Sequence, residues 1–149
     1  MGNTALNDYK GRLMQAIADG ADLMVIPMSS VDSDTDFEDG YADFFLDTVL
    51  GDAQNIEQTG STWNRKIHLS ANITATVDDS ADLMRAILDN DDTWTAPLAG
   101  NDTVALLIVI DGASDAVREV IGKWDFAVTT DGNDVTANYD QTNGIWTAA

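Results

Sequence analysis

The sequence predicts one domain of the α+β class that is mainly β: an antiparallel β-sandwich or barrel-like sheet with an N-terminal helix and a second helix packed against it. Two segments before residue 60 repeat apolar residues with the period of a helix. After residue 60, short segments rich in Thr, Val, Ile and Trp alternate with turn signals. The 149 residues and 44% hydrophobic content suffice for one ordinary core, so we expect a single domain over residues 1–149.

The first predicted element is a helix over residues 3–19. Leu6, Leu13 and Ile17 recur at helical spacing on one face, and Gly20 supplies a C-terminal stop. An apolar strand over residues 23–26 follows, and we expect Pro27 to end it, because proline cannot donate a hydrogen bond to a neighbouring strand.

A second helix is predicted over residues 35–49. Thr35 and Glu38 have the spacing of a capping box, in which the hydroxyl and the carboxylate satisfy free amides at the start of a helix. Aromatic and apolar residues continue to Val49, and Gly51 ends the segment.

The remaining chain predicts short strands joined by tight turns. Asp111-Gly112, Asp131-Gly132 and Asn143-Gly144 are pairs that readily adopt hairpin turns. Residues 104–110 are apolar throughout, so we place this strand centrally, with the two helices over one side or edge of the sheet. The predicted strands cover residues 62–69, 73–77, 83–88, 93–95, 103–111, 117–124, 126–129, 135–139 and 144–147.

The charge excludes several classes of partner. With 26 acidic and 7 basic side chains, the formal net charge is −19, so phosphates of nucleic acids and anionic lipids are repelled. No apolar stretch approaches the roughly 20 residues of a membrane span. Without cysteine, the chain has no disulfide, thiol nucleophile or cysteine zinc site. We therefore expect neither a nucleic-acid nor a membrane partner.

Asp32, Asp34 and Asp36 form a weak candidate metal cluster. Their alternate spacing is that of the first oxygen ligands of a helix–loop–helix calcium site. Such a loop also needs glycine at its sixth position and glutamate at its twelfth, where this chain has Phe37 and Asp43. The alternative is that these carboxylates stabilise the start of the second helix, so we predict neither a metal nor another cofactor.

The sequence carries no pattern typical of a catalytic site. His68 is the only histidine, and we expect it at a surface position of its strand, without a nucleophile motif beside it. The acidic cluster Asp89, Asp91 and Asp92 is expected to be a solvated loop. We therefore predict a protein that is not an enzyme, although paired carboxylates of an unrecognised hydrolase remain an alternative.

Four tryptophans lie in predicted strands and are candidates for an interface. Trp63, Trp94, Trp124 and Trp146 could pack the core, contact another protein, or stack on sugars if their rings face outward.

The order of segments along the chain resembles a widespread group of small virion proteins of tailed bacteriophages. The resemblance covers nearly the whole chain and depends on order and spacing. It is carried by ALNDYKG (5–11), YADFFLD (41–47), WNRK (63–66), ITATVDD (73–79), DDTWTAPL (91–98), VALLIVI (104–110), VTTDGNDVT (128–136) and NGIW (143–146).

The resemblance implies a structural component of the virion without catalytic residues. We expect a decoration or cement protein on the outer capsid surface that contacts the major capsid protein or other virion proteins and forms a homo-oligomer. The acidic exterior suits an outward face better than one lining packaged DNA. The alternatives are a neck, tail or fibre-associated virion protein, and a carbohydrate-binding or calcium-dependent binding module.

Overall fold

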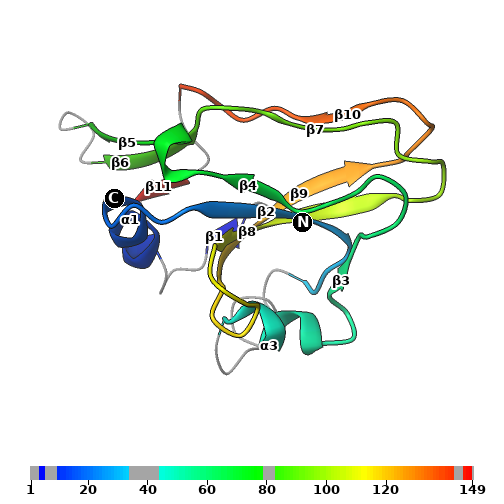
Figure 1. The fold of residues 1–149 in the computed structure, drawn as a ribbon, viewed down its shortest axis with the longest axis horizontal. Coiled ribbons are helices and arrows are strands. Elements are labelled where there is room, and N and C mark those ends of the chain that lie inside the picture. The colour runs from blue at the N-terminus through cyan, green and yellow to red at the C-terminus, as the bar shows by residue number, and fades with distance from the viewer. Residues whose placement is uncertain (1–3, 6–9, 34–43, 79–82, 143–145, 149) are drawn as a thin grey trace.

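The central feature of the fold is an open antiparallel sheet, seen from one edge in Figure 1. The computed structural model describes residues 4–5, 10–33, 44–78, 83–142 and 146–148. Every strand pairing among them is antiparallel, and the sheets they form do not close into a barrel. The predicted fold class, α+β and mainly β, is confirmed, and its sheets are open.

The main sheet has the strand order β1-β9-β8-β2-β3, and β4 also pairs with β2. Two smaller sheets, β10-β7 and β11-β6-β5, accompany it. The strands are β1 (Thr4–Ala5), β2 (Leu23–Ser30), β3 (Ile56–Glu57), β4 (Lys66–His68), β5 (Ile73–Asp78), β6 (Leu83–Leu88), β7 (Asp92–Trp94), β8 (Thr103–Ile110), β9 (Glu119–Val128), β10 (Val135–Ala137) and β11 (Trp146–Ala148). The helices are α1 (Lys10–Ala18), α3 (Leu46–Gly51) and the short 3-10 helix η2 (Ser70–Asn72).

Strand β8 lies between β2 and β9, as its uninterrupted apolar sequence predicts. Its side chains alternate between two separate cores, one on each face of the sheet. Leu106 and Ile108 face α1 and the smaller sheets, whereas Leu107 and Val109 face α3. Both faces are covered, so a polar residue at any of these positions would be buried without a partner.

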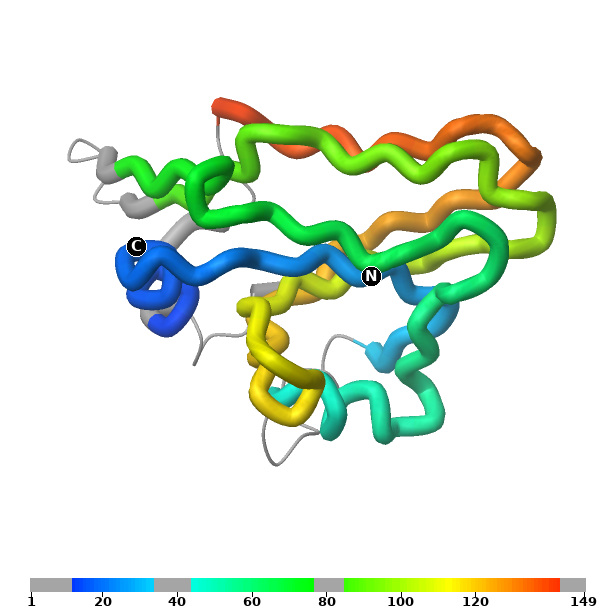
Figure 2. The backbone as a smooth tube through the Cα atoms, in the orientation of Figure 1, coloured from blue at the N-terminus to red at the C-terminus, as the bar shows by residue number. Residues whose placement is uncertain are grey.

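The two helices lie on opposite faces of the main sheet. Leu13 of α1 belongs to the core that also contains Leu88 and Trp94, whereas Leu46 and Val49 of α3 pack into the other core. Figures 1 and 2 show α3 below the sheet and strands β7 and β10 above it. The expectation that both helices cover one side is wrong, because each face of β8 needs its own apolar cover.

The first helix is shorter than predicted. It begins at Lys10 instead of residue 3, and Thr4–Ala5 form a strand that pairs with Gly122 and Lys123 of β9. The end is as predicted, since Gly20 has a φ of +79°.

Strand β2 continues through Pro27, where the sequence predicts its end. Pro27 lies opposite Leu106, and its carbonyl accepts a hydrogen bond from the Gln58 amide on the outer side of the sheet. On that side, β4 pairs with residues 23–25 of β2, and β3 pairs with Met28 and Ser30. Pro27 lies between these two pairings, so neither edge strand loses a hydrogen bond to the N–H that proline lacks.

In the described residues, the second predicted helix is present over its last part. Residues 34–43, including the expected capping box, lie outside the described residues. Phe45 is extended, with a ψ of 143°, and forms a bridge with Glu119. Among the described residues of this segment, the backbone of residues 44–46 bonds to Arg118 and Val120, and the helix runs from Leu46 to Gly51.

Two further strand boundaries differ from the prediction. Strand β9 is one continuous strand with irregular register against β8, where two strands were predicted. Strand β4 covers only three of the eight residues predicted for that segment, because Trp63 and Asn64 are engaged by loop and core contacts instead.

Candidate functional site

Trp63 and Trp94 are core residues, which makes the interface prediction wrong for these two side chains. They are 4% and 1% exposed, and their ring centroids lie 4.9 Å apart. Their indole N–H groups donate to the carbonyls of Asn101 and Asn64, at 2.6 and 2.9 Å. Rings held in this way cannot stack on a sugar or reach a partner.

The other two tryptophans occupy different positions. Trp124 is half-buried on β9 and packs against Tyr139, with ring centroids 5.6 Å apart. The backbone of Trp146 pairs with Ala86 in strand β11, and its side chain lies outside the described part of the structure. The tryptophans therefore do not form one exposed row.

Asp32 is engaged by protein groups. Its amide and carboxylate bond to the side chain of Asn55, and its carbonyl oxygen lies 3.2 Å from Nζ of Lys123, a fully buried lysine. Asp34 and Asp36 lie outside the described residues. Within the described ranges, no group of three or more His, Cys, Asp or Glu side chains is arranged to hold a metal ion.

His68, Asp92 and Tyr139 form a buried polar cluster that the sequence did not predict. The Nε2 atom of His68 lies 2.9 Å from Oδ2 of Asp92, and the Tyr139 hydroxyl donates to the same oxygen at 2.7 Å. His68 is 4% exposed, so the expected surface histidine is wrong, and the solvated-loop interpretation is wrong for Asp92. Burial and the neighbouring Asp92 carboxylate raise the pKa of the Tyr139 hydroxyl.

This cluster connects two strands and the segment after β10, and its side chains are too enclosed for a substrate to reach. It ties β4 to β7 and to the segment after β10, across sequence separations of 24 and 47 residues. Local sequence patterns do not indicate contacts between residues that are so far apart in the chain. The cluster therefore stabilises the packing of the smaller β7–β10 sheet on the main sheet.

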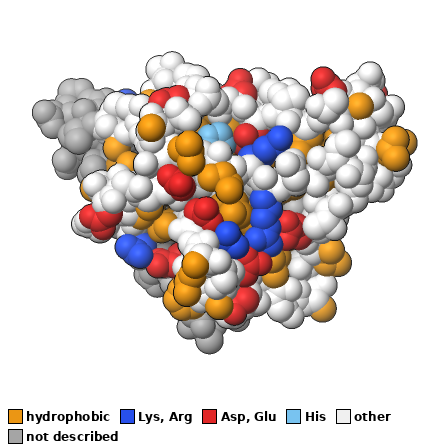
Figure 3. All heavy atoms as spheres, in the orientation of Figure 1, with side chains coloured by type: hydrophobic (Ala, Val, Ile, Leu, Met, Phe, Trp, Pro, Cys, Tyr) orange, Lys and Arg blue, Asp and Glu red, His pale blue; other side chains and the backbone are white. Residues whose placement is uncertain are grey.

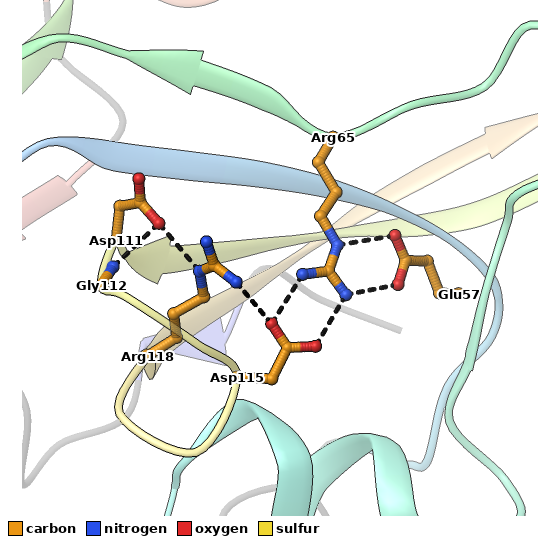
Figure 4. A network of polar contacts seen from close by, with 6 residues as sticks. All are labelled: Glu57, Arg65, Asp111, Gly112, Asp115 and Arg118. Carbon is orange, nitrogen blue, oxygen red and sulfur yellow. Dashed lines mark hydrogen bonds and ion pairs between the residues drawn. The ribbon is translucent and has the colours of Figure 1, made fainter.

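A second polar cluster, the Arg65 network, lies at the surface and is drawn in Figure 4. Arg65 binds Glu57 through two bonds of 2.8 and 2.7 Å and Asp115 through two bonds of 2.7 and 3.0 Å. Arg118 binds Asp111 at 2.8 Å and Asp115 at 2.7 Å. Two arginines thus connect β3, the segment before β4 and the loop of residues 111–118.

The electrostatics of the Arg65 network stabilise its ionised form. Hydrogen bonds from Arg65, followed by those from Arg118, lower the pKa of Asp115 to about 2. The bonds to Glu57 and Asp115 raise the pKa of the Arg65 guanidinium. Planar guanidinium groups that bind carboxylates through paired bonds hold their geometry tightly, so the loop is fixed against the edge of the sheet.

Beside the Arg65 network lie three exposed apolar side chains, Ile56, Ile67 and Leu69, which we group as the β3–β4 edge. Ile56 lies opposite Ser30 near one end of β2, and Ile67 lies opposite Met24 near the other. The three side chains are 52%, 54% and 55% exposed, and they account for three of the six large hydrophobic side chains that are exposed in the described residues. Val117, in the loop fixed by the Arg65 network, is a fourth. Figure 3 shows hydrophobic side chains gathered with basic and acidic ones on this side of the molecule.

Lys66, the charged residue of β4, is turned away from the edge. Its Nζ atom donates to the Thr93 carbonyl at 2.8 Å and lies 5.4 Å from the centre of the Trp94 ring. Lysines on edge strands usually project into solvent and discourage pairing with other strands. Here the ammonium is held against the smaller sheet, so the β3–β4 edge lacks that protection.

Comparison of the chain with protein families, curated proteins and solved structures found no match. None of the described helices has the length and apolar character needed to cross a membrane.

Proposed function

We propose that the chain is a non-enzymatic structural protein of a tailed-bacteriophage virion, and that it acts as a decoration or cement protein on the outer surface of the capsid. The proposal combines the resemblance in segment order with one structural observation. That observation is the β3–β4 edge: an exposed apolar sheet edge on a protein whose net charge is −19. Such edges are typical surfaces for binding protein.

The physical properties of the edge suit a permanent contact. Ile56, Ile67 and Leu69 are each about half exposed, and covering the remaining apolar surface contributes about 1 kcal/mol for each side chain. The Arg65 network holds the neighbouring loop in place, so less conformational entropy is lost on binding.

The charge distribution supports an outward position on the shell. A surface rich in carboxylates repels DNA phosphates and the surfaces of other particles. The contact is therefore expected to be made through the nearly neutral edge, while the acidic remainder faces solvent.

The test is to count copies of the chain in purified virions. Isotope-labelled peptides from this chain and from the major capsid protein calibrate a mass-spectrometric measurement of their molar ratio. We expect a copy number comparable to that of the shell subunits. A few copies per particle would indicate a neck or tail protein instead, and none would refute the virion proposal.

Rebinding provides the structural control. Particles stripped of the chain should bind the purified protein, whereas Ile56→Lys should bind at least tenfold more weakly because it places a charge in the apolar contact. Leu98→Lys is the matched control, since Leu98 is 65% exposed but lies outside β3 and β4, in the loop between β7 and β8. Equal loss in both variants would show that the edge is not the binding surface.

A further inference from the structure

We propose that two copies of this chain pair through strand β4, in antiparallel orientation about a two-fold axis at Ile67, so that their main sheets become continuous. The inference rests on the proposed function in one respect, namely that the β3–β4 edge binds protein. It assigns a second copy, with its symmetry and register, to the β4 part of that edge, which pairs with residues 23–25 of β2. Ile56 on β3, at the other end of β2, is left for the shell.

Among the described strands, β4 pairs with β2 alone, so one side of its backbone pairs with no described strand. The Pro27 carbonyl of β2 accepts from Gln58 on the outer side of the sheet, and the Asp22 carbonyl accepts from Asp111 on the β8 side. Because alternate residues of a strand point to opposite neighbours, Leu23 and Val25 direct their backbone groups toward His68 and Lys66. The N–H and C=O groups of Ile67 therefore point away from β2, to the side of β4 that pairs with no described strand.

A free strand edge of this kind is complementary to itself. In an antiparallel pair centred on Ile67, the N–H of each Ile67 donates to the C=O of the other, and both bonds follow from one two-fold axis. The Ile67 side chain projects on the same face of the strand as that of Leu69, so the pairing brings four exposed apolar side chains together. Lys66 and His68 point to the opposite face, where Thr93 and Asp92 already bind them.

Charge favours a second copy at this edge over any other part of the surface. Two molecules of net charge −19 repel each other wherever their acidic surfaces meet. The groups that border β4 are nearly balanced, because three cations lie among three carboxylates. Asp22, which accepts from the Ser70 amide, and Asp92, which contacts His68, bring the local formal charge to −2 with the histidine counted as neutral. The balanced side chains are Arg65, Lys66, Arg118, Glu57, Asp111 and Asp115.

The first test is the mass of the purified protein in solution. Sedimentation velocity over a wide concentration range should show conversion to a species of twice the 16.0 kDa chain mass. Raising the salt concentration should strengthen association, because the Debye length falls to about 3 Å at 1 M salt and screens the mutual repulsion. Ile67→Lys should weaken dimerisation at least tenfold, whereas the matched Leu98→Lys should dimerise like the wild type.

The second test uses the lack of cysteine in the chain. Two Ile67 residues paired across the axis would have Cα atoms about 5.5 Å apart, within the range that a disulfide spans. Under a mild oxidant, Ile67→Cys should therefore form a covalent dimer much faster than Leu98→Cys at the same concentration. Circular dichroism of both variants confirms that each remains folded.

The outcomes separate this inference from the proposed function. A wild-type protein that stays monomeric at all concentrations would overturn the inference, and so would a dimer in which Ile67→Cys cross-links no faster than Leu98→Cys. Particles that bind a monomeric chain would leave the virion proposal intact while overturning the dimer. A dimer cross-linked through Ile67→Cys that is absent from virions would support the inference and refute the proposed function.

Discussion

Asp115 connects the two arginines of the Arg65 network, so Asp115→Asn should destabilise the protein in a pH-dependent way. The variant keeps the size of the side chain and removes the charge that faces both guanidinium groups at 2.7 Å. Arg65 would retain Glu57 and Arg118 would retain Asp111. The loop of residues 111–118 should therefore remain folded but lose its strongest connection to the segment before β4.

The magnitude follows from the pKa of Asp115. A decrease from 3.8 to about 2 corresponds to at most about 2.4 kcal/mol of stabilisation at neutral pH. The side chain is 33% exposed, and screening by solvent lowers this to about 1 to 1.5 kcal/mol. For a chain of this size, the loss is about 3 to 5 °C in Tm.

The sign of the pH dependence is fixed by the direction of the pKa change. The unfolded state binds a proton to Asp115 as the pH falls below about 4, whereas the folded state stays ionised until about pH 2. The contribution of Asp115 is thus complete above pH 5 and is lost as the pH falls toward 2. Urea unfolding at pH 7, 4 and 3 should show the stability difference between wild type and Asp115→Asn becoming smaller at each step.

Asp19→Asn is the matched control, because this carboxylate accepts a bond from the Gln15 amide and has no arginine partner among the described residues. This control corrects for the stability that an acidic protein gains when the loss of one negative charge reduces the repulsion among its carboxylates. An Asp115→Asn effect equal to that of Asp19→Asn, or one that stays constant from pH 7 to pH 3, would refute the reasoning.

Three further predictions concern the core and one turn. Tyr139→Phe should cost about 1.5 to 3 kcal/mol in urea unfolding, because Asp92 loses a buried donor; an unchanged midpoint would contradict this. Trp94→Ala should cost about 3 to 5 kcal/mol and alter the near-ultraviolet circular dichroism of the adjacent Trp63, whereas a surface position for Trp94 would give less than 1 kcal/mol. Gly132→Ala should lower the free energy of unfolding by about 1 to 2 kcal/mol, because Gly132 has a φ of +90°. Thermal unfolding measures the effect, and Gly51→Ala is the control because Gly51 does not have a positive φ.

The elements that the sequence predicts correctly are those defined by local pattern. The continuous apolar run of β8 predicts a strand buried on both faces, and Gly20 predicts the end of α1. Most strands after residue 60 also lie close to their predicted positions, since turn residues separate them. Composition by itself determined the strongly acidic charge and the lack of any thiol chemistry.

The elements predicted wrongly are those whose environment comes from distant residues. Phe45 is extended because its backbone meets Glu119. Pro27 is tolerated within β2 because β4 pairs with the residues before it and β3 with the residues after it, so neither strand requires its missing N–H. The helices separate to opposite faces because β8 presents an apolar surface on each. Backbone pairing between remote segments outweighs local helix propensity, which is worth only tenths of a kcal/mol for each residue.

The candidate binding surface depended still more on tertiary structure. The sequence singles out tryptophans, but the fold buries Trp63 and Trp94 and leaves Ile67 exposed at a strand edge. His68 and Asp92 are 24 residues apart, and Arg65 and Asp115 are 50 apart, so only folding brings each pair into contact. The sequence alone determined the fold class, the charge and the period of the apolar pattern, because these depend on neighbouring residues. The tertiary structure decided which side chains are buried, paired or exposed, because those properties depend on contacts between segments that are far apart in the chain.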